Sequence, residues 1–152
     1  MKKVISLATA LVMCLVMFAG CGSSEVKLSE VMDKINSDFS LSLTPIDSVD
    51  KLNTYYSIEA DDVKQFAAEN DSNNNASVEI VMVEAKDATA ADAVEKALTA
   101  RYNSIYSQYS SYSADQLDMV KKCKVTKDGN FVSMIVADKA EDMLKVYYEY
   151  VK

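Results

Sequence analysis

Apolar residues recur along this chain with two different periods, and each period predicts a different kind of element. Spacings of three and four residues predict amphipathic helices over residues 27–37, over residues 90–109 and after Asp138. The inner stripe of the longest helix is Val94, Leu98, Tyr102, Ile105 and Tyr109. Asp87 or Thr89 can cap this long helix, and Asp138 can cap the last one, because a carboxylate or hydroxyl oxygen accepts from the free N–H groups of the first turn.

Two segments have the composition of strands. Residues 77–85 are rich in β-branched side chains and apolar on both faces at their centre, which predicts an interior strand. Residues 123–126 and 131–136 flank an Asp-Gly pair, and Gly129 accepts the positive φ that a tight turn needs. These two runs therefore predict a β-hairpin.

Three shorter helices complete the expected elements. Asp47 can cap a helix that runs through Leu52 and Tyr55. Residues 60–69 place Val63, Phe66 and Ala67 on one face, which also predicts a helix. A capping box opens a further helix within residues 113–121.

The order of these elements predicts an α+β fold. After the N-terminal helices the order is β-α-β-β-α, and a three-stranded sheet, mixed or antiparallel, with helices packed on it buries the apolar faces economically. We expect one domain over residues 27–152, preceded by a short tether at residues 21–26.

The first twenty residues have the pattern of a secretory signal peptide. Lys2 and Lys3 precede an apolar run over residues 8–19 that only Thr9 interrupts, and small residues follow it. The run is shorter than the about 20 residues of a membrane-spanning helix. We therefore leave residues 1–20 out of the fold.

The end of this segment, Phe18-Ala19-Gly20-Cys21, resembles the lipobox of bacterial lipoproteins, with Phe18 in place of the usual leucine. The resemblance implies cleavage before Cys21, a diacylglycerol on its thiol, and a protein held at the outer, extracytoplasmic face of the cell membrane. The alternative is an ordinary signal peptide followed by a chance cysteine.

Charge narrows the range of partners. The whole chain has a formal charge of −7, and loss of the two lysines in residues 1–20 lowers it to −9. An acidic surface repels nucleic acids and anionic head groups, so we expect no nucleic-acid partner. The lipid, rather than a basic patch, would then hold the protein to the membrane.

Several catalytic and cofactor chemistries lack their residues. The chain has no histidine and only three glycines, so histidine-based triads, histidine metal sites and phosphate-binding glycine loops are excluded. We predict no metal and no cofactor. Cys14 and Cys21 leave Cys123 as the one ordinary thiol, which is either a buried apolar residue or a reactive group.

The acidic residues offer weak candidates for a site. Glu59, Asp61 and Asp62 form the densest cluster, but the start of the predicted helix favours negative charge without any catalysis. Residues 71–75 open like a calcium loop, yet the required glycine and bidentate glutamate are missing further along. We predict no catalytic residue.

Tyrosine is the enriched residue that has functional potential. The candidate binding residues lie on two predicted helices and are Tyr102, Tyr106, Tyr109, Tyr147 and Tyr150. Tyrosines can stack on sugars or anchor a partner protein. The alternative is that they line the helix–sheet core, and both can hold because Tyr106 lies towards the edge of the inner stripe.

The order of several segments resembles a family of small lipoproteins from clostridia-like Gram-positive bacteria, known as domain of unknown function 4358. The similarity extends from about Leu28 to Lys152, and the segments that carry it are residues 55–58, 60–63, 79–83, 97–101 and 124–136. The resemblance implies an exported α/β domain and no assigned activity.

These observations favour a non-enzymatic binding or interaction module anchored to the membrane, with an envelope protein or a glycan as partner. Two alternatives remain open. One is a carboxylate-based hydrolase of cell-wall glycan, which needs two carboxylates across an open cleft. The other is an accessory subunit of an envelope complex.

Overall fold

A five-stranded antiparallel sheet forms the centre of the molecule, with strand order β1-β2-β3-β5-β4. The structure is a computed structural model and describes residues 25–71, 78–112 and 114–152. The strands are β1 (Thr44–Pro45), β2 (Val63–Asn70), β3 (Glu79–Ala85), β4 (Lys124–Asp128) and β5 (Phe131–Val136). The expected α+β class is confirmed, but the sheet is larger than the three strands predicted.

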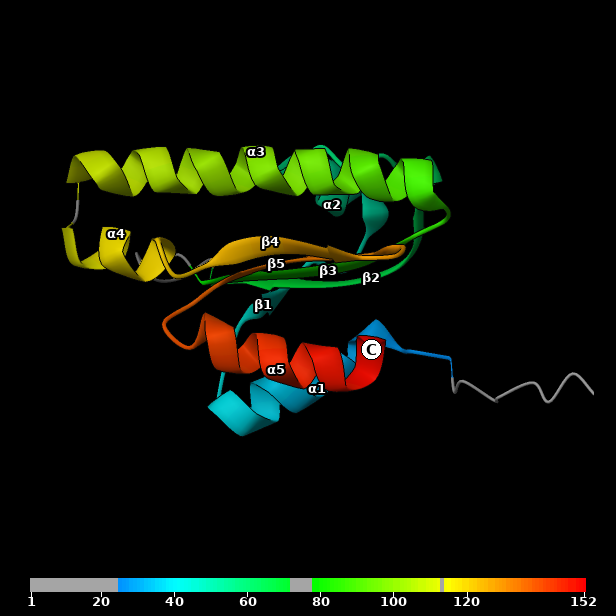
Figure 1. Ribbon diagram of the computed structural model, residues 1–152, viewed down its shortest axis with the longest axis horizontal. Helices are drawn as coiled ribbons and strands as arrows, with labels where there is room; N and C mark the ends of the chain where they lie inside the picture. The colour runs from blue at the N-terminus through cyan, green and yellow to red at the C-terminus, as the bar shows by residue number, and fades with distance from the viewer. Residues whose placement is uncertain (1–24, 72–77, 113) are drawn as a thin grey trace, which may run out of the picture.

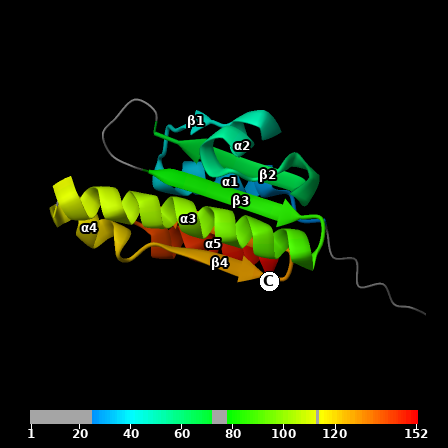
Figure 2. The same cartoon turned by 90° about the horizontal axis from the view of Figure 1, so that it is seen from above.

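Helices cover both faces of the sheet, so the domain has three layers (Figure 1). The layer drawn above the sheet contains α2 (Val49–Tyr56) and α3 (Ala88–Tyr112), while α4 (Ala114–Val120) lies beyond the left end of the sheet, at its level. The layer drawn below contains α1 (Leu28–Phe39) and α5 (Ala140–Val151). A short 3-10 helix, η1 (Ala60–Asp62), leads into β2. Viewed from above, α3 runs along the sheet with α2 beside it over β2 (Figure 2).

The core contains the apolar stripes that the sequence predicts. All seven residues of β3 are buried, which confirms the interior strand. On α3, Val94, Leu98 and Ile105 are at most 2% exposed. Cys123 is also buried, and its Sγ lies 3.5 Å from the carbonyl oxygen of Ala137. The Cys123 thiol is therefore a buried core group, which is one of the two interpretations that the sequence leaves open.

The helix predicted over residues 60–69 is wrong. Only Ala60–Asp62 form a helical turn, and the chain then continues as β2, paired with β3 from Val63 to Asn70. Helix-forming residues such as Ala67 and Ala68 adopt the strand because pairing with a distant segment outweighs local preference. Because residues 63–70 form a strand, their other edge can pair with β1. Thr44 and Pro45 of β1 lie opposite Asn70 and Glu69.

A β-bulge interrupts the start of β2. Gln65 lies opposite Glu84 and Val63 lies opposite Ala85, so Lys64 is the extra residue. Gln65 also ties the beginning of the domain to the sheet, since its side chain donates to the carbonyl of Val26 and accepts from the N–H of Leu28. The bulge and these bonds shape the end of the sheet where the described chain begins.

The sequence predicts aspartate N-caps at three helices, and one of these predictions is correct. Asp87 caps α3, because its Oδ1 accepts from the N–H of Ala90 at 2.9 Å. Ser48, not Asp47, caps α2, while Asp47 forms an ion pair with Lys51. Asp138 does not cap α5, which begins after Lys139. There the N–H of Ala140 already bonds to the carbonyl of Ala137.

The predicted hairpin is confirmed, and Gly129 has a φ of +58° in its turn. Three other sequence predictions lie outside the described residues. They are the signal peptide and Cys21 within residues 1–24, most of the polar loop after Asp71, and Ser113 of the capping box. Within the portion that the structure describes, none of the helices combines the length and apolar character needed to span a bilayer.

Candidate binding surface on α2 and α3

The five candidate tyrosines do not form one surface. Tyr102, Tyr106 and Tyr109 lie on α3, whereas Tyr147 and Tyr150 lie on α5. These helices pack on opposite faces of the sheet (Figure 1). Any shared site would therefore have to reach around the sheet, so the two groups must be considered separately.

Three of these tyrosines belong to the packed interior. Tyr109 is 6% exposed and Tyr147 is 1% exposed. Tyr102 is half-buried, and its hydroxyl donates to the carbonyl of Val120 at 2.9 Å, which links α3 to the end of α4. Tyr106 and Tyr150 are exposed at 39% and 36%. Tyr102, Tyr109 and Tyr147 therefore contribute to the core, whereas Tyr106 and Tyr150 lie at the surface.

The outward face of the C-terminal half of α3 carries no unpaired charge. Arg101 is the one ionised residue between positions 97 and 111. The exposed residues of this stretch are Thr99, Ala100, Asn103, Ser104, Tyr106, Ser107, Gln108, Ser110 and Ser111. Surfaces built from tyrosine, serine and asparagine suit recognition, because tyrosine supplies rigid contact area and the small polar residues supply adaptable hydrogen bonds.

A cavity of about 250 Å³ lies between this face and α2, and we call it the α2–α3 cavity. Its lining residues are Tyr55, Tyr56, Ser57, Ala97, Ala100, Arg101 and Ser104. Tyr55 is 54% exposed, the largest exposed fraction among the large apolar residues of the described chain. The sequence predicts Tyr55 on a helix, but no sequence pattern identifies it as a site residue. Leu52 and Tyr56, four residues apart, form the buried face of α2 instead.

Arg101 is held in place at this cavity by a carboxylate from the sheet. Its Nε donates to Glu79 Oε2 at 3.0 Å, and its Nη2 donates to Glu79 Oε1. Such a bidentate pair fixes the plane of the guanidinium. The Glu79 side chain is 7% exposed and that of Arg101 is 37% exposed. The hydrogen bonds to Glu79 raise the pKa of Arg101 above its usual value.

Tyr56 brings a hydroxyl group to the same place without a partner. The residue is 3% exposed, and its hydroxyl has no hydrogen-bond partner among the described residues. Burial raises the pKa of this phenol, and the negative charge of Glu79 raises it further. Glu79 thus lies close to the hydroxyl, although their geometry falls short of a regular hydrogen bond. An unpaired buried hydroxyl is uncommon, because burial without a partner costs free energy.

A larger cavity of about 540 Å³ lies at the end of the sheet where the described chain begins, and we call it the terminal cavity. Its lining residues are Glu25, Val26, Lys64, Glu84, Phe131, Tyr150, Val151 and Lys152. Lys64 Nζ lies 2.8 Å from Glu84 Oε1 and 3.7 Å from Glu25 Oε1. Gln65 donates to the other oxygen of Glu84 at 2.6 Å. Both oxygens of Glu84 are therefore engaged within the protein.

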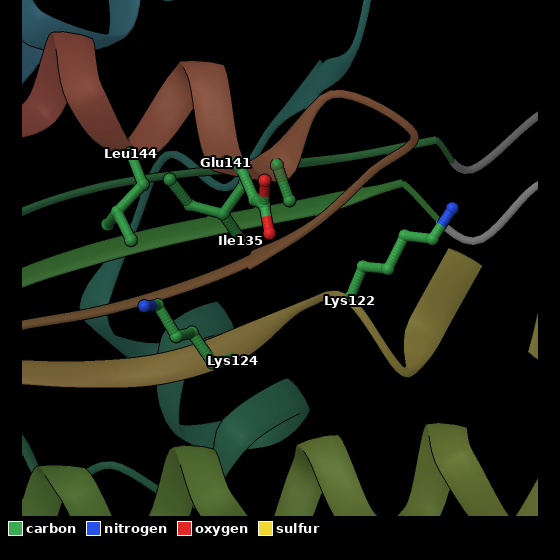
Figure 3. Close-up of a pocket in the computed structure, with 6 residues that line it drawn as sticks. Lys122, Lys124, Ile135, Glu141 and Leu144 are labelled. Atoms are coloured by element: carbon green, nitrogen blue, oxygen red, sulfur yellow. The ribbon is translucent and has the colours of Figure 1, made fainter. Parts of the chain in front are cut away.

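Neither the acidic cluster nor the hollow beside α5 forms a site for a ligand. The carboxylates expected at a helix start lie at η1, where Glu59, just before it, accepts from Asn53 and Asp62 pairs with Lys86. A hollow between β4, β5 and α5 holds about 10 Å³, room for about one water molecule. Figure 3 shows Leu144 and Glu141 extending from α5 towards this hollow, with Lys124 reaching it from β4. Within the described ranges no three acidic or thiol side chains are grouped to hold a metal ion.

The fold and this surface define an α+β domain with one uncharged, tyrosine- and serine-rich helix face. The chain belongs to the family described as Domain of unknown function (DUF4358), which matches residues 35–137. Membership of domain of unknown function 4358, which the sequence predicts, is therefore confirmed. No curated protein and no solved structure matches the chain significantly.

Proposed function

We propose that the protein is a lipoprotein anchored by Cys21 to the outer face of the cell membrane, where it acts as a non-enzymatic binding module. The observation that carries the proposal is the lipobox-like Phe18-Ala19-Gly20-Cys21, placed directly after an apolar run with a basic start. Two acyl chains give durable attachment because each buried methylene contributes about 0.8 kcal/mol.

The geometry of the domain supports a binding role for such a protein. Glu25 follows Cys21 by four residues, a maximum reach of about 14 Å. The described chain begins at the end of the domain where α3 also starts, and α3 runs to the opposite end (Figure 1). Its 25 residues measure about 37 Å. A domain tethered at Cys21 could therefore direct the tyrosine- and serine-rich half of α3 away from the bilayer.

Incorporation of labelled fatty acid tests the anchor directly. We expect label in the full chain and in Cys14→Ser, a control that changes the other cysteine of the N-terminal segment. Cys21→Ser should take up none, because the thiol is the acceptor. Label that persists in Cys21→Ser, or that depends on Cys14, would refute the assignment.

One arrangement favours the hydrolase alternative as a second candidate. Glu25 and Glu84 both face the terminal cavity, one on each side of Lys64. A glycosidase needs two such carboxylates, one of them able to donate a proton. The engagement of both Glu84 oxygens by Lys64 and Gln65 counts against that role. Release of reducing sugars from cell-wall glycan that Glu84→Gln abolishes would establish the hydrolase.

A further inference from the structure

We propose that the α2–α3 cavity binds one ring of an uncharged, polyhydroxylated ligand, and that this ligand is a sugar unit of a neutral envelope glycan. The inference deepens the proposed function, and rests on it, by naming the ligand class of the binding module. It is carried by four features of the cavity: its size, its exposed aromatic wall, its hydrogen-bonding side chains and its neutrality.

The size and walls of the cavity suit a single ring. About 250 Å³ is below the about 300 Å³ at which sites for drug-sized ligands begin. Tyr55 presents a half-exposed ring on one side, and Ala97 and Ala100 form a small, apolar part of the lining from α3. The flat face of a tyrosine ring packs well against the apolar face of a sugar, while its hydroxyl end remains hydrated.

The polar groups of the lining can satisfy several ligand hydroxyls at once. Ser57 and Ser104 each offer a donor and two acceptor positions. Arg101 has five N–H donors, and its bonds to Glu79 are made by Nε and Nη2.

Neutrality of the cavity selects against ions. The positive charge of Arg101 is matched by Glu79, and no other lining residue is ionised at neutral pH. A charged ligand would lose its hydration here without meeting an opposite charge, which is unfavourable. An uncharged ligand with many hydroxyls has no such penalty. The outward face of α3 beyond the cavity is likewise hydroxyl-rich and uncharged, so neighbouring units of a glycan chain could continue along it.

Calorimetric titration of the full chain in detergent with a tetramer of β-1,4-linked N-acetylglucosamine tests the proposal. We expect saturable binding that Tyr55→Ala weakens by about tenfold or more, since truncated aromatic anchors dominate such sites. Tyr150→Ala is a matched control that also removes an exposed tyrosine. Tyr150 lines the terminal cavity, away from α2 and α3. This variant should bind within about twofold of the parent chain.

Other outcomes separate this inference from the proposed function. A fatty-acylated, folded protein that shows no binding of the tetramer at millimolar concentration overturns the sugar site and leaves the anchored module standing. Binding that survives Tyr55→Ala, or that Tyr150→Ala abolishes, overturns the location. If the tetramer does not bind but a protein from the same membrane is retained in a Tyr55-dependent manner, the ligand class is wrong.

Discussion

Arg101 and Glu79 join α3 to β3 beside the α2–α3 cavity, and replacing each in turn should have unequal effects on stability. Arg101→Met leaves the Glu79 carboxylate, only 7% exposed, buried without its cation. Loss of one partner of a buried pair costs about 3–5 kcal/mol, and the 37% exposure of Arg101 places this case near the lower end, about 3 kcal/mol. Glu79→Gln retains an acceptor and leaves a cation that water can reach, so we expect about 1 kcal/mol.

Urea unfolding followed by circular dichroism measures both values, provided that the denaturant slope stays constant. The double variant should lose less than the sum of the two single variants, because each change already breaks the same pair. Equal losses for the two single variants, or a larger loss for Glu79→Gln, would refute the description of Glu79 as the more deeply buried partner. If each single variant lost less than about 0.5 kcal/mol of unfolding free energy, the pair would instead be a surface pair that solvent screens.

Three further predictions concern the fold. Gly129→Ala should lower the free energy of unfolding by about 1–2 kcal/mol in a thermal melt; the whole loss comes from the left-handed backbone, because a Cβ there meets nothing within 4 Å. Gly129→Asn should lower it less, and equal losses for the two variants would contradict this reasoning. Asp87→Ala should cost about 1 kcal/mol by removing the cap from the N–H of Ala90, with Asp87→Asn close to the parent. Burial raises the pKa of the Cys123 thiol, which leaves less thiolate at pH 8, so mass spectrometry should find its peptide alkylated slowly in buffer and rapidly in urea; equal rates would place the thiol at the surface.

Much of the fold follows from local patterns. The interior strand β3, the hairpin of β4 and β5, and helices α1 and α3 each carry a periodicity or a turn residue that identifies them without knowledge of their neighbours. Gly129 and Asp87 act through groups only a few residues away, so their roles were readable from the sequence.

The elements that were missed depend on distant partners. Residues 63–70 contain good helix formers, and only their pairing with β3 makes them a strand. The two residues of β1 pair with the other edge of β2. A strand as short as β1 has no sequence signal of its own, so the predicted sheet lacks both β1 and β2.

The candidate site could be predicted only in part. The tyrosine enrichment predicts a surface on α3, but the exposed ring beside the cavity is Tyr55 from α2. Arg101 and Glu79 are 22 residues apart in the chain and meet only because α3 packs on β3. The unpaired Tyr56 hydroxyl has no counterpart in any sequence pattern, because it depends on what the folded chain places around it.

The most direct test of the membrane-anchored module is mass spectrometry of the N-terminal peptide of the protein purified from its own membranes. We predict that Cys21 is the first residue, that residues 1–20 are absent, and that a diacylglycerol is attached to the sulfur of Cys21. A mature protein that begins at another residue, or an unmodified Cys21, would contradict it.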